Sequence, residues 1–314
     1  MKPFLTRIIF TLLVITPLCS YSQTDSTYIK PFAQNFSLKV YASNKIASLL
    51  HENLLEENTY DPNRPPGIGV GFTLGKMGVS VSYGFDFLRD KEKGHTRSLD
   101  LQYHNYGRKI VFDLMGQYYE GFYNDNNQNN YETHPDLKTI KLGFFGQYIF
   151  NSSRFSYRAA FNQKERQVKS AGSFLLGGGI YYNEVHSDIP GFFSNPDCVK
   201  QVNFQIGPSA GYAYNWAITE RYFISLSASA GFNLGFTNDQ KFMIYPTAIP
   251  RFATGYNAES WSISLSYVNN LIYTYYTKSR KIALSSGGVQ LTFVKRVGRT
   301  PAFLEKPAKK LRLL

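Results

Sequence analysis

Eight ionisable side chains in the middle of this sequence have types and spacings that could do chemistry. If neighbouring strands bring Asp100 or Asp113 to His104, the resulting carboxylate–imidazole pair could act as a general base in hydrolysis. The other five are cations, which could bind an anionic group or line the path of a solute. They are Lys141, Arg158, Lys164, Arg166 and Arg251.

Catalysis finds little support elsewhere in the sequence. None of the 5 histidines lies in an HExxH or HxxxH spacing that would hold a metal, and no GxSxG nucleophile motif occurs. The stretch LLGGGI lacks the Lys-Ser/Thr of a phosphate loop. We therefore expect no cofactor. The ionisable groups then either pair inside a polar interior or form a small-solute constriction around Arg158, Lys164, Arg166 and Arg251.

The elements that would position these residues are β-strands. Tyr222–Phe236 reads YFISLSASAGFNLGF, in which large apolar residues alternate with Ser, Gly and Asn, and a period of two is typical of a strand with two different faces. The same alternation recurs along the chain. It covers Gly67–Leu74, Gly78–Phe87, Asn203–Trp216 and Ser260–Val268, and more weakly 36–43, 97–105, 109–121, 138–150, 155–161, 172–184, 241–256 and 282–294.

The polar face of these strands is unusual for a soluble protein. It carries Ser, Gly and Asn in place of the Lys and Glu that cover most solvated surfaces. Tyr222–Phe236 would span about 45 Å and, tilted by roughly 40°, rise about 35 Å, which is enough to cross a bilayer. Aromatic residues at both strand ends, among them Tyr222 and Phe236, would form two girdles. We predict a transmembrane antiparallel up-and-down β-barrel with its apolar face toward lipid.

Connections of two kinds support this arrangement. Tight turns at 75–76, 106–107, 151–153, 217–219 and 257–259 alternate with longer polar loops at 89–96, 124–136 and 278–281, as in outer-membrane barrels. With both ends of the chain on the periplasmic side, the strand number must be even, yet about thirteen segments alternate. We predict about 12 strands, with 163–170 as an inward excursion or bulge, and 14 as the alternative.

The ends of the chain have their own signals. Lys2, Arg7 and the apolar run from Ile8 to Leu18 predict a signal peptide over 1–22 with cleavage before Gln23, against a retained anchor or acylation of Cys19. Removal of the leader would leave Cys198 as a lone thiol. Half of the net charge of +12 lies between Lys295 and Leu314, so the charge marks a tail and does not predict nucleic-acid binding.

Three motifs resemble a family. FAQNFSLKVYASNK, YDPNRPPGIGVGF and above all AAFNQKERQVKSAGSFLLGG are similar to an uncharacterised domain-of-unknown-function family of outer-membrane β-barrels from Bacteroidota, over about 32–294. The resemblance implies a barrel in the outer membrane of a Gram-negative bacterium, and it brings no substrate or catalytic residue. Many barrels end on an aromatic residue, here Phe293, and the twenty or so residues beyond it depart from that pattern.

Together these observations predict a periplasmic segment over 23–35, a barrel over 36–297 and a basic periplasmic tail over 298–314. The function we expect is non-enzymatic passage or binding of a small solute or lipid in a polar lumen, open or plugged. The alternatives are a barrel-type lipid hydrolase acting through His104 and a soluble secreted ligand-binding barrel. The partners we expect are outer-membrane lipid, the barrel assembly machinery and a small solute.

Overall fold

The strand predicted over Tyr222–Phe236 has the opposite burial pattern to a strand of a soluble protein. In the computed structural model, β12 (Tyr222–Thr237) alternates exposed and buried residues without a break. Its exposed residues are apolar, such as Leu226 at 49% and Phe232 at 67%, whereas Ser225 and Ser227 are at most 2% exposed. The Ser, Gly and Asn face therefore points inward and the apolar face outward, as predicted. The structure describes residues 24–34, 36–54, 56–74, 77–125, 131–195, 197–238 and 242–298.

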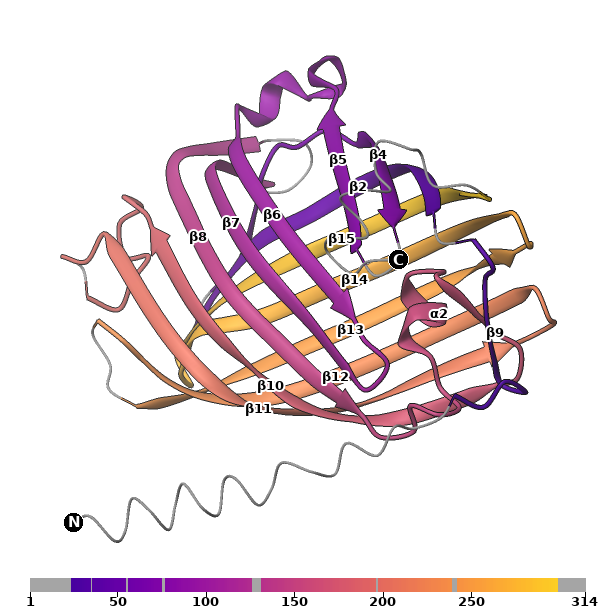
Figure 1. Cartoon of the computed structure of the whole chain (residues 1–314). Helices are drawn as coiled ribbons and strands as arrows, with labels where there is room; N and C mark the ends of the chain where they lie inside the picture. Colours follow the sequence, from indigo (N-terminus) through magenta and orange to yellow (C-terminus); the bar gives the residue numbers. More distant parts are fainter. Residues whose placement is uncertain are drawn as a thin grey trace, which may run out of the picture.

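Strands make up most of the described chain, with short helical turns between some of them. The elements are β1 (Ile29–Pro31), β2 (Phe36–Asn53), β3 (Glu57–Asp61), β4 (Gly67–Leu74), β5 (Met77–Gly84), η1 (Asp86–Leu88), η2 (Lys91–Lys93), β6 (Arg97–Tyr106), β7 (Ile110–Asp125), β8 (Tyr131–Ile149), α2 (Tyr157–Phe161), β9 (Glu165–Gln167), β10 (Ala171–His186), β11 (Lys200–Ala217), β12, β13 (Met243–Asn257), β14 (Trp261–Tyr276) and β15 (Arg280–Val297). Figure 1 shows the strands wrapping around a common axis.

All strand pairs are antiparallel, and the sheet closes on itself. Hydrogen bonds run in the order β2, β3, β7, β8, β10, β11, β12, β13, β14, β15 and back to β2, which makes a ring of ten strands in the described chain. The hairpin β4–β5 adds to β2, and β6 adds to β7, on the side where β3 is short. The predicted number of about 12 strands is close to the number in the whole sheet, which includes β4, β5 and β6. The closed hydrogen-bonded ring contains fewer strands.

Gly121 lies where β7 changes its neighbouring strand from β6 to β3. Gly121 has a φ of +84°, and the pairing of β7 with β8 shifts register between Glu120 and Phe122. On its other edge β7 pairs with β6 up to Glu120 and with β3 from Tyr123 onward. A side chain would be strained at this φ, and a Cβ on Gly121 would lie 2.3 Å from the backbone oxygen of His95.

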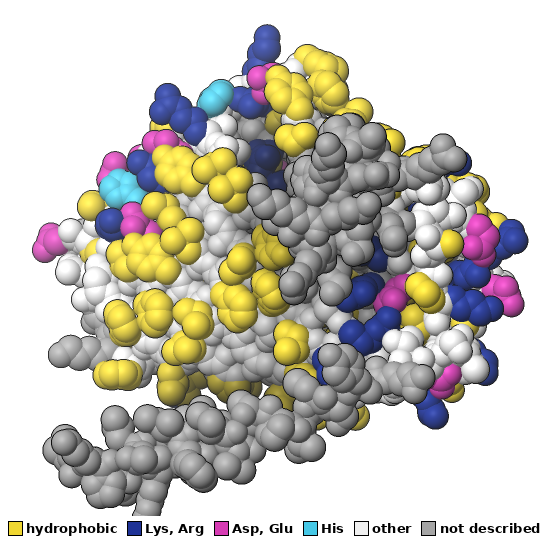
Figure 2. Space-filling view, viewed as in Figure 1, with side chains coloured by type: hydrophobic (Ala, Val, Ile, Leu, Met, Phe, Trp, Pro, Cys, Tyr) yellow, Lys and Arg dark blue, Asp and Glu magenta, His cyan; other side chains and the backbone are white. Residues whose placement is uncertain are grey.

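Aromatic rings gather at the strand ends on the outer face. At the tight-turn end, Tyr222, Tyr256, Trp261 and Phe293 follow one another with ring centroids 4.7, 5.2 and 6.1 Å apart. At the long-loop end, Phe204 and Phe236 lie 5.8 Å apart. Figure 2 shows hydrophobic side chains over the near wall and charged ones gathered toward the ends of the molecule. This distribution is typical of a barrel that sits in a bilayer.

Two features of the fold differ from the sequence prediction. The segment 155–161 alternates like a strand but contains the helix α2, because Ser156 caps it by accepting a hydrogen bond from the Ala159 amide at 3.0 Å. The short β3 was not predicted, because five polar-rich residues carry almost no alternation. The signal peptide, the turn at 75–76 and the tail from 299 lie outside the described residues. No described helix is long and apolar enough to cross a membrane.

Candidate functional site

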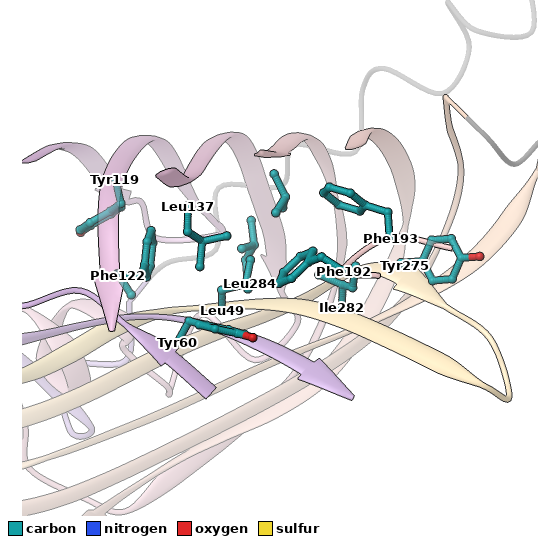
Figure 3. Packing of buried hydrophobic residues seen from close by; sticks show 12 residues of the cluster. Leu49, Tyr60, Tyr119, Phe122, Leu137, Phe192, Phe193, Tyr275, Ile282 and Leu284 are labelled. Carbon is teal, nitrogen blue, oxygen red and sulfur yellow. The ribbon is translucent and has the colours of Figure 1, made fainter. Parts of the chain in front are cut away.

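The lumen is filled in layers, and the layer at the long-loop end is apolar. Phe192 and Phe193, in the connection between β10 and β11, are 2% and 3% exposed and pack into a cluster inside the barrel. Figure 3 shows Phe192 beside Leu49, Ile282 and Leu284 of the wall, and Phe193 packs edge-on against Phe192 with ring centroids 5.1 Å apart. The ring of His51 stacks on Phe192 at 4.5 Å, and its Nε2 lies 2.9 Å from the Phe192 carbonyl oxygen. We call this cluster the aromatic cap.

Beneath the cap, polar side chains from opposite walls meet in the middle of the barrel. Gln147 of β8 donates a hydrogen bond to Ser229 of β12 at 2.9 Å. Gln205 of β11 donates one to the Tyr273 carbonyl of β14 at 2.8 Å. Such contacts across the lumen occupy the space that a water-filled pore would need.

The predicted acid–histidine pair forms within this polar layer. His104 Nδ1 lies 2.5 Å from Asp113 Oδ1, since the two residues face each other in the register of β6 and β7. Asp113 also forms a buried ion pair with Arg251 of β13. Arg251 donates in addition to the Tyr106 hydroxyl at 2.9 Å. Asp113, His104 and Arg251 thus come together as one network that joins two walls.

Asp100 and Lys141 belong to a different part of the polar layer. Asp100 is bonded to Lys45 Nζ at 2.6 Å and to the amide of Gln102 at 3.0 Å, so it pairs with β2 and not with His104. Lys141, which is 3% exposed, donates to Ser286 Oγ at 2.6 Å from the opposite wall. No described carboxylate lies within ion-pair distance of Lys141.

The segment between β8 and β10 closes the tight-turn end as a plug. It contains α2 and β9, and β9 pairs with β1 to form a two-stranded sheet. Phe155, Tyr157 and Ala160 of this plug are at most 3% exposed and pack on the wall at Ile149 and Leu175. Figure 1 shows α2 and β9 at the end where the tight turns lie. The inward excursion predicted for 163–170 is confirmed, and it begins earlier in the sequence.

The plug carries most of the predicted cations. Arg158 Nε donates to the Tyr106 carbonyl at 2.6 Å, at the end of β6. Arg166 pairs with Glu259 at 2.9 Å, across the rim. Burial lowers the pKa of Lys164 to about 8, and the neighbouring charges of Arg158 and Lys39 act in the same direction.

Sequence reasoning missed three further cations at this end. Arg108 pairs with Glu165 of the plug at 2.6 Å. Arg296 donates to the Gln163 carbonyl at 3.1 Å, and Lys39 lies over the ring of Tyr41 at 5.3 Å. On β2 and β15, Lys39 and Arg296 occupy positions that alternate with exposed apolar residues. The alternation in the sequence could therefore have placed both side chains on the inner face. Together with Arg158, Lys164 and Arg166 of the plug, these three cations form a group that we call the basic chamber. In it the cations outnumber the two carboxylates, Glu165 and Glu259.

Arg158, Lys164 and Arg166 lie in the plug, and Arg251, which pairs with Asp113, lies over the ring of Tyr157 of the plug at 5.9 Å. Lys141 stands apart on β8. Two further charged residues near the strand ends lie outside the lumen. Asp86 is in η1, with its side chain 72% exposed, and pairs with Arg89. Arg221 is in an exposed turn and bonds the Tyr256 hydroxyl.

A closed antiparallel ring with an apolar outer face and a polar, filled interior defines a class, the transmembrane β-barrel of outer-membrane type. Residues 23–295 match the family described as "Domain of unknown function (DUF4421)", and the protein belongs to that family. No curated protein matches the sequence.

Solved structures with a similar fold are distant. The outer membrane protease OmpT from Escherichia coli has 10% identity and a TM-score of 0.35, covering 88% of this chain and 100% of its own. The outer-membrane OmpT of Vibrio cholerae has 9% identity and a TM-score of 0.32, covering 82% and 96%. The Pseudomonas putida toluene transporter TodX has 6% identity and a TM-score of 0.25, covering 85% and 91%. These similarities are too weak to transfer an activity.

Proposed function

We propose that this protein is exported with cleavage of a signal peptide near Ser22, assembled by the barrel assembly machinery into the outer membrane of a Gram-negative bacterium, and binds a small anionic solute or lipid there. The observation that carries the proposal is the basic chamber, where the charges of Arg158 in the plug and Lys39 on β2 both act on Lys164 of the plug. Clustered cations at a partly wet site favour a phosphate or carboxylate group.

The filled lumen favours binding over free passage. The aromatic cap and the plug occupy the two ends, and side chains cross between them, so a solute could pass only if one end moved. A soluble secreted barrel is disfavoured because residues such as Leu226 and Phe232 are about half exposed or more on the outer face.

Calorimetric titration of the purified protein in detergent with sn-glycerol 3-phosphate tests this proposal. Losing one charge-assisted hydrogen bond costs about 1.5 kcal/mol or more, so Lys164→Gln should weaken binding by about tenfold. Lys200→Gln is the matched control, because Lys200 pairs with Glu184 at 2.8 Å at the other end of the barrel. Equal affinity of the two variants, or no heat with the unmodified protein, would contradict the proposal.

The contact between His104 and Asp113 favours one second candidate, a barrel-type lipid hydrolase. The described residues bring no serine or threonine hydroxyl into hydrogen bonding with His104, so the pair would have to activate water. Phospholipid hydrolysis that disappears in His104→Ala would support this candidate. Absence of hydrolysis, or hydrolysis that survives the substitution, would remove it.

A further inference from the structure

One place in the wall lacks the pairing found everywhere else around the barrel. In the described chain, β5 is bonded to β4 and β6 to β7, and no pairing joins β5 to β6. Figure 1 shows the two strands as neighbours on the near wall with no strand between them. Open strand edges are not stable in hydrocarbon, because nothing there can satisfy their backbone groups. Whatever lies between β5 and β6 must therefore present polar atoms. We call this place the seam.

Both faces of the strands beside the seam are accessible. Ser80, Val81, Ser82 and Tyr83 of β5 are all exposed, and so are the consecutive residues 101–104 of β6. On the closed wall, by contrast, every second residue of β12 is buried. The side chain of His104 points inward and is still 44% exposed. The inner face of β6 is thus reachable through the seam.

Among the described residues, side chains behind the hairpin β4–β5 join the two sides of the seam near Asp100. Lys45 of β2 reaches Asp100 of β6 at 2.6 Å, and Arg64 donates to Tyr119 of β7 at 2.9 Å. No ion pair or side-chain hydrogen bond joins β4 or β5 to β6 among the side chains that the structure describes. Among the described side chains, which on β5 begin at Ser80, no such tie is made toward the tight-turn end of the seam.

The basic chamber lies directly behind that part of the seam. Lys39 is on β2, opposite Gly71 of β4 in the sheet register. Arg158 is bonded to the carbonyl of Tyr106, the last residue of β6, at 2.6 Å. Lys164 lies near both cations. Positive charge thus lies on both sides of the seam, with Arg158 at the end of β6 and Lys39 on β2, on the far side of the hairpin β4–β5.

The outer wall next to the seam carries a matching apolar feature. A groove of about 630 Å³ runs outward from β6 across β7 and β8 to β10 and β11. Its lining includes Leu101, Tyr103, Leu114, Leu142, Phe144 and Phe204. An apolar groove on a lipid-facing wall suits a hydrocarbon chain, while the cations of the chamber suit an anionic head group.

We propose that the seam admits an anionic phospholipid from the bilayer, with its phosphate at Lys39, Arg158 and Lys164 and one acyl chain in the groove beside β6. This rests on the proposed function and specifies its ligand. The basic tail after Gly298 is the other candidate occupant, but Lys306, Lys309, Lys310 and Arg312 would repel the cations of the chamber.

Two measurements on the full-length protein test the seam. Native mass spectrometry after titration with phosphatidylglycerol and with phosphatidylcholine of the same chains measures head-group preference. We expect phosphatidylglycerol to bind at least tenfold tighter, and the preference to vanish in Lys39→Gln/Lys164→Gln but not in Lys138→Gln/Lys200→Gln. A benzophenone side chain at Gln102 should crosslink to lipid in vesicles, whereas one at Ser229, on the closed inner wall, should not.

Each other outcome overturns the inference. Equal binding of the two lipids, or equal crosslinking at Gln102 and Ser229, would exclude a lipid in the seam. Crosslinks from Gln102 to residues 299–314, with lipid crosslinks appearing only after truncation at Gly298, would make the tail the occupant. If sn-glycerol 3-phosphate still binds while lipid does not, the proposed function stands and the seam inference fails. If neither binds, both fail.

Discussion

Replacing Arg251 by methionine tests the network that joins the two walls. The side chains of Arg251 and Asp113 are 6% and 7% exposed, so the variant would leave a carboxylate in a site with little water. Removing one member of a buried ion pair costs about 3–5 kcal/mol. His104, 2.5 Å from Asp113, stays as a hydrogen-bonding partner and offsets part of the loss, so we expect about 3 kcal/mol.

Urea unfolding in phospholipid vesicles measures this loss, with the 2 tryptophans of the chain, Trp216 and Trp261, as natural fluorescent probes. In the double variant Arg251→Met/Asp113→Leu the penalty should shrink, with a coupling energy of about 2 kcal/mol between the sites. Lys200→Met, which breaks an exposed pair, should cost less than about 1 kcal/mol. A loss below about 1 kcal/mol for Arg251→Met, or strictly additive single effects, would refute the reasoning.

Three further predictions concern the outer face, the chamber and the cap. Leu226→Arg should destabilise the barrel by about 2–4 kcal/mol in vesicles, whereas Glu220→Arg in the adjacent turn should leave the urea midpoint unchanged; the reverse order would mean that the outer face is not in lipid. Affinity for sn-glycerol 3-phosphate should fall between pH 7 and pH 9, because Lys164, with its pKa lowered to about 8, loses its charge in that window; a flat calorimetric profile would count against Lys164 as a ligand. Phe192→Ala should lower stability by about 3 kcal/mol or more, because it empties a 2% exposed site in the cap, and an unchanged urea midpoint would show that the cap does not pack.

The sequence predicted the inverted barrel because its alternation is nearly complete in strands such as β12. Small polar residues on one face and large apolar ones on the other can be read without any partner. The helix α2 could not be read, because Tyr157–Phe161 has the same alternation as a short strand, and burial inside the barrel decides between them. The short β3 carried too few residues to show a period.

The partners of the candidate site residues depend on how the walls are staggered across the lumen. His104 and Asp113 lie 9 residues apart on adjacent strands, so their contact was within reach of the sequence. Arg251 and Asp113 lie 138 residues apart on different walls, and no local pattern fixes which cation meets which acid. The missing pairing between β5 and β6 could not be predicted either, because the sequence of β5 alternates in the same way as that of strands paired on both edges.

Planar-bilayer conductance tests most directly the central claim that the lumen is closed and serves for binding. The unmodified protein should give no sustained conductance steps. Replacement of residues 154–169 by a short Gly-Ser turn removes the plug, and the resulting barrel, if it keeps its heat-modifiable shift on gels, should give larger and more frequent openings. Sustained steps from the unmodified protein would contradict a closed lumen and would make free passage the function.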